Sequence, residues 1–95
     1  MNIPDPLIGA FVPVRITKIV DDPQTVLRID GRLRSEDVDE LVKVFRSVQG
    51  ATVLDLSELQ SADRQAAEVL RELLALGVEV RGASPYIELL LKAKS

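Results

Sequence analysis

The fold is decided by residues 53–91, which read VLDLSELQSADRQAAEVLRELLALGVEVRGASPYIELLL. Val53, Leu54 and Leu56 are a short apolar run, typical of a strand that is buried in a sheet, and Asp55 interrupts the run near its end. Residues 57–62 are mostly polar and are predicted to be a connection. The pattern that follows is helix, strand and helix, so the stretch alternates between the two kinds of element.

Asp63 stands where the first of these helices should begin. Its carboxylate can accept the free N–H groups of the first turn, and its negative charge suits the positive pole of a helix. Apolar residues then recur at helical spacing, and Gly77 follows as a stop; they are Ala66, Val69, Leu70, Leu73 and Leu74. Val78 and Val80 alternate with charged residues in a second strand. Ser84 and Pro85 mark the start of the last helix.

The upstream residues complete the pattern. Residues 14–19 and 26–33 are predicted strands, joined by a turn at residues 21–23. Ser35 is predicted to cap a helix with an acidic first turn that ends before Gly50. The order is β-β-α-β-α-β-α, an α/β domain with a mixed sheet of about four strands and three main helices. We expect one domain over residues 14–95, preceded by a Pro-rich extension over residues 1–13.

Several short motifs give this chain a resemblance to the STAS family, the domain of anti-sigma-factor antagonists. Members have a strand ending Asp-Leu-Ser, followed by a helix that opens with Asp and two hydroxyl residues. The matches here are Asp55-Leu56-Ser57, Asp63, Leu70, Leu73 and Gly77, with the Ser84-Pro85 helix start. Upstream, VLRIDGRL (26–33) resembles the family's second strand and its Gly turn. The resemblance spans about residues 14–91 and implies the family's α/β fold.

The chain departs from the family where a cognate kinase phosphorylates its members. Arg64 and Gln65 stand in place of the two hydroxyl residues, so the acceptor position is occupied by Gln65 and no phosphorylation site is expected. After Gly31 the family commonly has an acidic residue, whereas Arg32 and Arg34 are cations here. If the family fold holds, Arg32, Arg34 and Arg64 form a basic spot.

The resemblance implies a partner-binding surface built from the start of the second helix and the turn at Gly31. Its candidate residues are Gly31, Arg32, Arg34, Asp55, Asp63, Arg64, Gln65 and Glu68. Alternatively, these residues have a structural role and bind no partner. Asp63 is then only a helix cap, and Arg64 pairs with Asp63 or Glu68. Arg32 and Arg34 then only keep a turn soluble.

Composition excludes several other classes of function. The chain has no Cys and no His, so it lacks the strongest nucleophile and the commonest general base. Asp37 and Asp39 point to different sides of a helix start and do not form a metal pair. The net charge of −3 disfavours nucleic-acid binding through a broad cationic face. We therefore predict a non-enzyme without cofactor or metal, located in the cytoplasm and without membrane insertion.

Two functional hypotheses follow from the resemblance. In the first, the chain is a protein-interaction module that binds an anti-sigma factor or kinase, or a transporter ATPase as an accessory subunit of a lipid-transport complex. In the second, it senses a small anionic ligand, a nucleotide or lipid, because N–H groups at a helix start favour anions. The residues Val12, Val14 and Ile16 also suggest an exposed edge that pairs weakly with a second copy.

Overall fold

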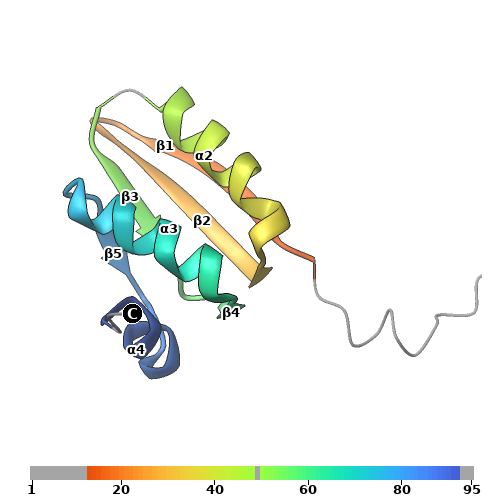
Figure 1. Cartoon of the computed structure of the whole chain (residues 1–95). Coiled ribbons are helices and arrows are strands. Elements are labelled where there is room, and N and C mark those ends of the chain that lie inside the picture. The colour runs from red at the N-terminus through yellow and green to blue at the C-terminus, as the bar shows by residue number, and fades with distance from the viewer. Residues whose placement is uncertain (1–12, 49, 93–95) are drawn as a thin grey trace, which may run out of the picture.

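The computed structural model describes residues 13–48 and 50–92 (Figure 1). In chain order its elements are β1 (Arg15–Asp21), β2 (Gln24–Leu33), the 3₁₀ helix η1 (Ser35–Asp37), α2 (Val38–Ser47), β3 (Thr52–Asp55), β4 (Leu59–Ala62), α3 (Arg64–Ala75), β5 (Glu79–Arg81) and α4 (Pro85–Lys92). The α/β class and the order of the predicted elements are confirmed. The predicted extension over residues 1–13, with Val12, lies outside the described residues except for Pro13.

Within the described residues the sheet is mixed and has five strands, one more than the sequence predicted. β1 and β2 form an antiparallel hairpin that runs from Arg15 opposite Asp30 to Asp21 opposite Gln24. β3 lies parallel beside β2, and β5 lies parallel beside β3. Parallel neighbours require a crossover connection, which α2 and α3 provide. The fifth strand, β4, pairs in parallel with the last residues of β2.

β4 corrects the prediction that residues 57–62 are only a polar connection. Leu59 and Ala62 are buried, while Gln60 between them is exposed. The segment pairs with β2 from Gly31 to Leu33, and the register shifts between Gly31 and Arg32. The predicted turn at Gly31 is wrong for the same reason, because β2 continues through this residue with a local irregularity. At this irregularity Gly31 has a positive φ of 92°, which glycine tolerates because it has no Cβ.

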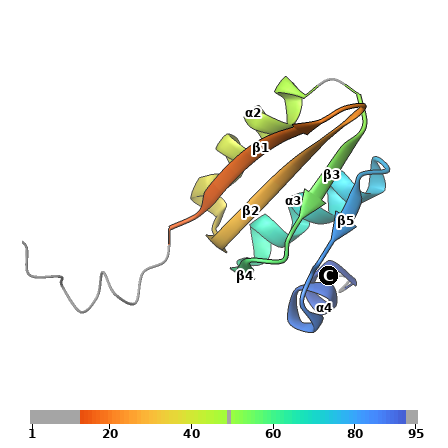
Figure 2. The same cartoon turned by 180° about the vertical axis from the view of Figure 1, so that it is seen from behind.

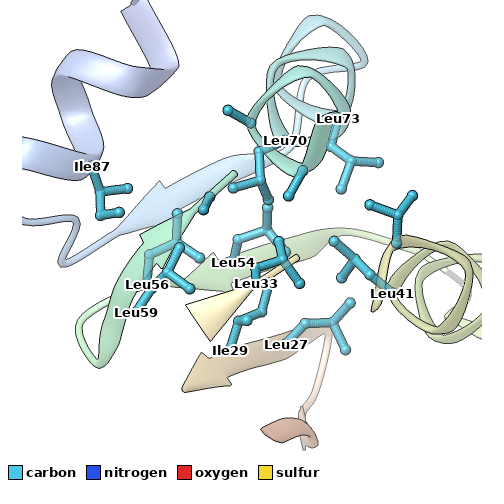
Figure 3. Close-up of a cluster of buried hydrophobic side chains, with 14 residues drawn as sticks. Leu27, Ile29, Leu33, Leu41, Leu54, Leu56, Leu59, Leu70, Leu73 and Ile87 are labelled. Atoms are coloured by element: carbon cyan, nitrogen blue, oxygen red, sulfur yellow. The ribbon is translucent and has the colours of Figure 1, made fainter. Parts of the chain in front are cut away.

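One face of the sheet is covered by α2 and α3 (Figure 1), and Figure 2 shows none of the described helices over the other face. We call the uncovered side the open face. Leu27 and Ile29 of β2 and Leu54 of β3 point toward the helices and are fully buried (Figure 3). Leu41 of α2 and Leu70 of α3 meet them in the same cluster. This alternation of buried and charged residues fixes which face of each strand is inside.

The start of α2 differs from the prediction that Ser35 caps it. The chain first makes the short helix η1, whose cap position is held by Arg34, and α2 begins only at Val38. The backbone N–H of Arg34 donates to the carboxylate of Asp37 at 3.0 Å. The N–H of Ser35 donates to Asp63, at 2.7 Å and 28 residues away in sequence. A tertiary contact has therefore replaced the local cap that the sequence favoured.

No helix in residues 13–48 and 50–92 combines the length and the apolar character that crossing a bilayer requires.

Candidate functional site

The candidate site is centred on Asp63, which caps α3 as the sequence predicted. One carboxylate oxygen accepts from the N–H of Ala66 at 2.9 Å, in the first turn of the helix. The other accepts from the N–H of Ser35 at 2.7 Å. The backbone N–H of Asp63 donates to the carbonyl of Leu33 at 3.0 Å. Through these bonds Asp63 joins the end of β2, η1 and the start of α3, and we call this arrangement the junction.

These contacts change the acidity of Asp63. Desolvation is the largest single influence and raises the pKa of the carboxyl group. The hydrogen bonds from Ala66, from both the backbone and the side chain of Ser35, and from the backbone of Gln65 together outweigh it, so the pKa lies below its ordinary value of 3.8. Asp63 is therefore ionised at neutral pH, and this charged form is the one that holds the junction together.

Three predicted residues project from the first turns of α3. Arg64 is 83% exposed at its side chain, and its Nε lies 3.9 Å from a carboxylate oxygen of Glu68, one turn further along. Gln65 is also exposed. The structure thus brings Arg64, Gln65 and Glu68 together on one short, accessible segment. An ion pair of this length and exposure contributes little to stability, so the side chain of Arg64 is free to move to a partner.

Arg32 of β2 and Arg34, which follows β2, are connected to this segment through the backbone. Arg32 is exposed, and its backbone lies opposite Ser61 of β4, two residues before Asp63. Arg34 follows Leu33, is half-buried, and has its guanidinium 3.8 Å from the carboxylate of Glu36. Two of the three cations in the predicted basic spot thus have an acidic neighbour. The surface around the junction is one of mixed charge.

Asp55 lies apart from the junction, at the end of β3. Leu54 points toward the helices, so Asp55 points to the open face, where its Cα partners are Arg28 of β2 and Arg81 of β5. The hydroxyl of Ser57 and then its N–H are the main causes that lower the pKa of Asp55. The structure therefore separates Asp55 from the other candidate residues.

The open face carries charged residues that the sequence did not single out. Arg28 donates to Asp30 at 2.9 Å, and Arg81 donates to Glu79 at 3.3 Å. Both arginines also act electrostatically on Asp55 between them. Alternation along each strand predicts which residues share a face, but only the strand order places these three strands side by side. Among the described residues, no group of three or more acidic side chains could hold a metal ion.

Comparison with known proteins supports the fold. No family model matches the chain, and no curated protein matches it significantly by sequence. A STAS-domain antisigma-factor antagonist from Rhodobacter sphaeroides is 22% identical, with a TM-score of 0.51 over 81% of this chain and 96% of that one. The unphosphorylated anti-sigma factor antagonist SpoIIAA is 17% identical, with a TM-score of 0.53 over 80% of this chain and 78% of that one.

A third solved structure, that of Mglu, contains a similar fold as a small part of a longer chain. It is 22% identical to this chain, with a TM-score of 0.51 over 67% of this chain, and the match spans only 18% of Mglu. At these identities the likeness concerns the fold. The chain therefore has the STAS-like, SpoIIAA-like fold that its sequence motifs predicted.

Proposed function

We propose that this chain is a non-catalytic protein-interaction module that binds a regulatory protein through the junction and the first turns of α3. The observation that supports this is that the carboxylate of Asp63 accepts two hydrogen bonds, from Ser35 after β2 and from Ala66 in α3, which fix the end of β2 against α3. A surface held in this way loses little entropy when a partner binds. Arg64 and Gln65, exposed on that fixed segment, are the residues that contact the partner.

The partner class that we propose is an anti-sigma factor or its kinase, by analogy with the antagonists of the same fold. Gln65 stands where a phosphorylatable residue would be, and an amide side chain does not accept a phosphoryl group from a kinase. Binding is therefore constitutive, or it is regulated at another site. A transporter ATPase is the alternative partner for the same surface, and identifying the bound protein distinguishes the two.

The geometry favours a protein partner over a small anionic ligand at this place. Anions bind at helix starts through free N–H groups. Here the carboxylate of Asp63 already accepts from Ala66 and from Ser35, and its own negative charge repels a phosphate. A nucleotide or lipid phosphate would have to displace the carboxylate of Asp63, which already accepts two backbone N–H groups.

The proposal predicts that Arg64→Glu weakens partner binding about tenfold while the fold is retained. The substitution replaces a cation with an anion on the contact surface. Its effect on the helix is small, because a negative charge suits the helix start and offsets the new repulsion from Glu68. Binding is measured by capture from the host lysate with tagged wild-type and variant proteins in parallel, followed by titration of the recovered partner.

The matched control is Lys43→Glu, the same change of charge at an exposed position on α2. A partner that is retained by the wild type and by Lys43→Glu, but lost by Arg64→Glu, supports the proposal. Equal recovery with all three proteins would remove Arg64 from the interface and would contradict the proposed surface.

A further inference from the structure

We propose that the outer edge of β1 pairs with the same edge of a second copy of this chain, which gives a two-fold dimer with a continuous sheet. β1 is the terminal strand of the described sheet, and its outer backbone groups have no strand partner there. The strand is seven residues long and exposes two large apolar side chains, Ile19 at 44% and Val20 at 71%. A long edge of this kind is a template for pairing with another strand.

Backbone geometry leaves few possible registers. In an antiparallel pair, residues opposite each other must point their backbone groups toward one another and their side chains to the same face. In a two-fold dimer, each residue of β1 therefore lies opposite a residue of the partner's β1 whose number is the same or differs by an even number. The register centred on Lys18 places Arg15 opposite the partner's Asp21, and Asp21 opposite the partner's Arg15.

Charge complementarity selects this register. Neither Arg15 nor Asp21 makes an ion pair in the described part of the chain. Asp30, which lies opposite Arg15 on β2, is instead bonded to Arg28 at 2.9 Å. In the dimer, Arg15 of each copy lies opposite Asp21 of the other copy, so two ion pairs of opposite charge form. Registers shifted by two residues place Arg15 opposite Ile19, or Thr17 opposite Asp21, and form neither ion pair.

The remaining pairs of this register are compatible with it. Ile16 meets the partner's Val20 on the side of the helices, and Thr17 meets the partner's Ile19 on the open face, as β-branched pairs that suit a sheet. Lys18 meets the partner's Lys18 at the centre. Its ammonium group donates to the hydroxyl of Ser47 at 3.5 Å, at the end of α2. Each lysine is therefore directed toward its own helix and away from the other lysine.

The dimer leaves the proposed binding surface accessible. The junction lies on the far side of β2 from the outer edge of β1, beside β4 and α3 (Figure 1). The two-fold axis makes the two junctions face opposite ends of the continuous sheet, so one dimer can hold two partner molecules. Because a single strand pair buries less than the roughly 1,600 Å² of a standard interface, we expect a weak dimer that dissociates on dilution.

Sedimentation velocity of the full chain from about 5 to 500 μM tests the dimer. Arg15→Asp and Asp21→Arg should each raise the dissociation constant at least tenfold, because each places like charges opposite one another. The double variant exchanges the two charges and should return to within about threefold of the wild type. Circular dichroism melting of each variant confirms that the monomer fold is intact. A monomer at every concentration, or a charge exchange that fails to restore the dimer, would overturn the proposal.

A single cysteine gives a second measurement, because the chain has none of its own. Lys18→Cys places two thiols opposite each other at the axis and should form a crosslinked dimer on mild oxidation. Thr17→Cys is the matched control, since its two Cα atoms would lie about 8 Å apart in this register, beyond the reach of a disulfide. Equal crosslinking of both variants would indicate random collision and would contradict the register.

Discussion

Replacing Leu54 with alanine should lower the free energy of unfolding by about 3–5 kcal/mol. Leu54 has no exposed surface and lies on the central strand β3, between Leu27 of β2 and Val80 of β5. Its side chain packs in the large apolar cluster that joins the sheet to α2 and α3 (Figure 3). Truncation leaves a cavity that close-packed neighbours on a sheet fill only in part. For a small domain this loss is a large fraction of a total stability of about 5–15 kcal/mol.

Urea unfolding followed by far-ultraviolet circular dichroism measures this effect, since the chain has no Trp and only one Tyr. The matched control is Leu89→Ala on α4, where the leucine is 69% exposed. We expect the control to change the free energy of unfolding by less than about 0.5 kcal/mol. Similar losses in the two variants would mean that the cluster around Leu54 is not the main core of the domain.

The parts of this fold that could be predicted from the sequence are those with local signals. Asp63 and Gly77 bracket α3 as a start and a stop, and the apolar residues between them recur at helical spacing. Ser84 accepts the N–H of Ile87 at 3.2 Å, as expected of a residue that caps α4. In each case the groups that determine the structure lie within a few residues of one another, so the sequence displays them directly.

Features that depend on distant contacts were missed or misread. β4 is four residues long, only two of them apolar, and it is a strand because its backbone pairs with the end of β2. Ser35 has the residue type of a helix cap, yet its N–H is bonded to a carboxylate 28 residues away. Neither the strand partner nor the distant carboxylate is visible in a local window of sequence, so propensity alone gave the wrong local structure.

The candidate site was predicted only in part for the same reason. Sequence motifs identified Asp63 and its neighbours on α3, and the structure brings them together with the end of β2. Asp55 was grouped with them because it belongs to a matching motif, although strand alternation directs it to the open face between Arg28 and Arg81. A motif records which residues occur together in a family, whereas the face of a residue follows from the strand on which it lies.

Asp63→Ala should lower the free energy of unfolding by about 2 kcal/mol at neutral pH, at the upper end of the range for a lost helix cap. The reason is that this carboxylate accepts two backbone hydrogen bonds, one in α3 and one from η1. Without it, the N–H of Ala66 loses its cap, and the N–H of Ser35 loses the bond that ties η1 to α3. Asp63→Asn keeps one acceptor oxygen and should lose about half as much, since asparagine caps helices nearly as well as aspartate. Chemical unfolding of the three proteins at neutral pH measures both values.

The dependence on pH distinguishes the charged carboxylate from a merely polar cap. The pKa of Asp63 in the folded chain lies below its ordinary value of 3.8, so its charged form stabilises the fold above that value. This stabilisation is lost as the pH falls through the lower, folded-state pKa. The stability difference between the wild type and Asp63→Asn should therefore begin to shrink about one pH unit above 3.8 and should go on shrinking as the pH falls below 3.8, because asparagine does not titrate in this range. Asp55 also titrates there, but it is present in both proteins and cancels in the difference. A gap that stays constant across this range would mean that the charge of Asp63 does not hold the junction, and the rigid surface proposed for partner binding would lose its physical basis.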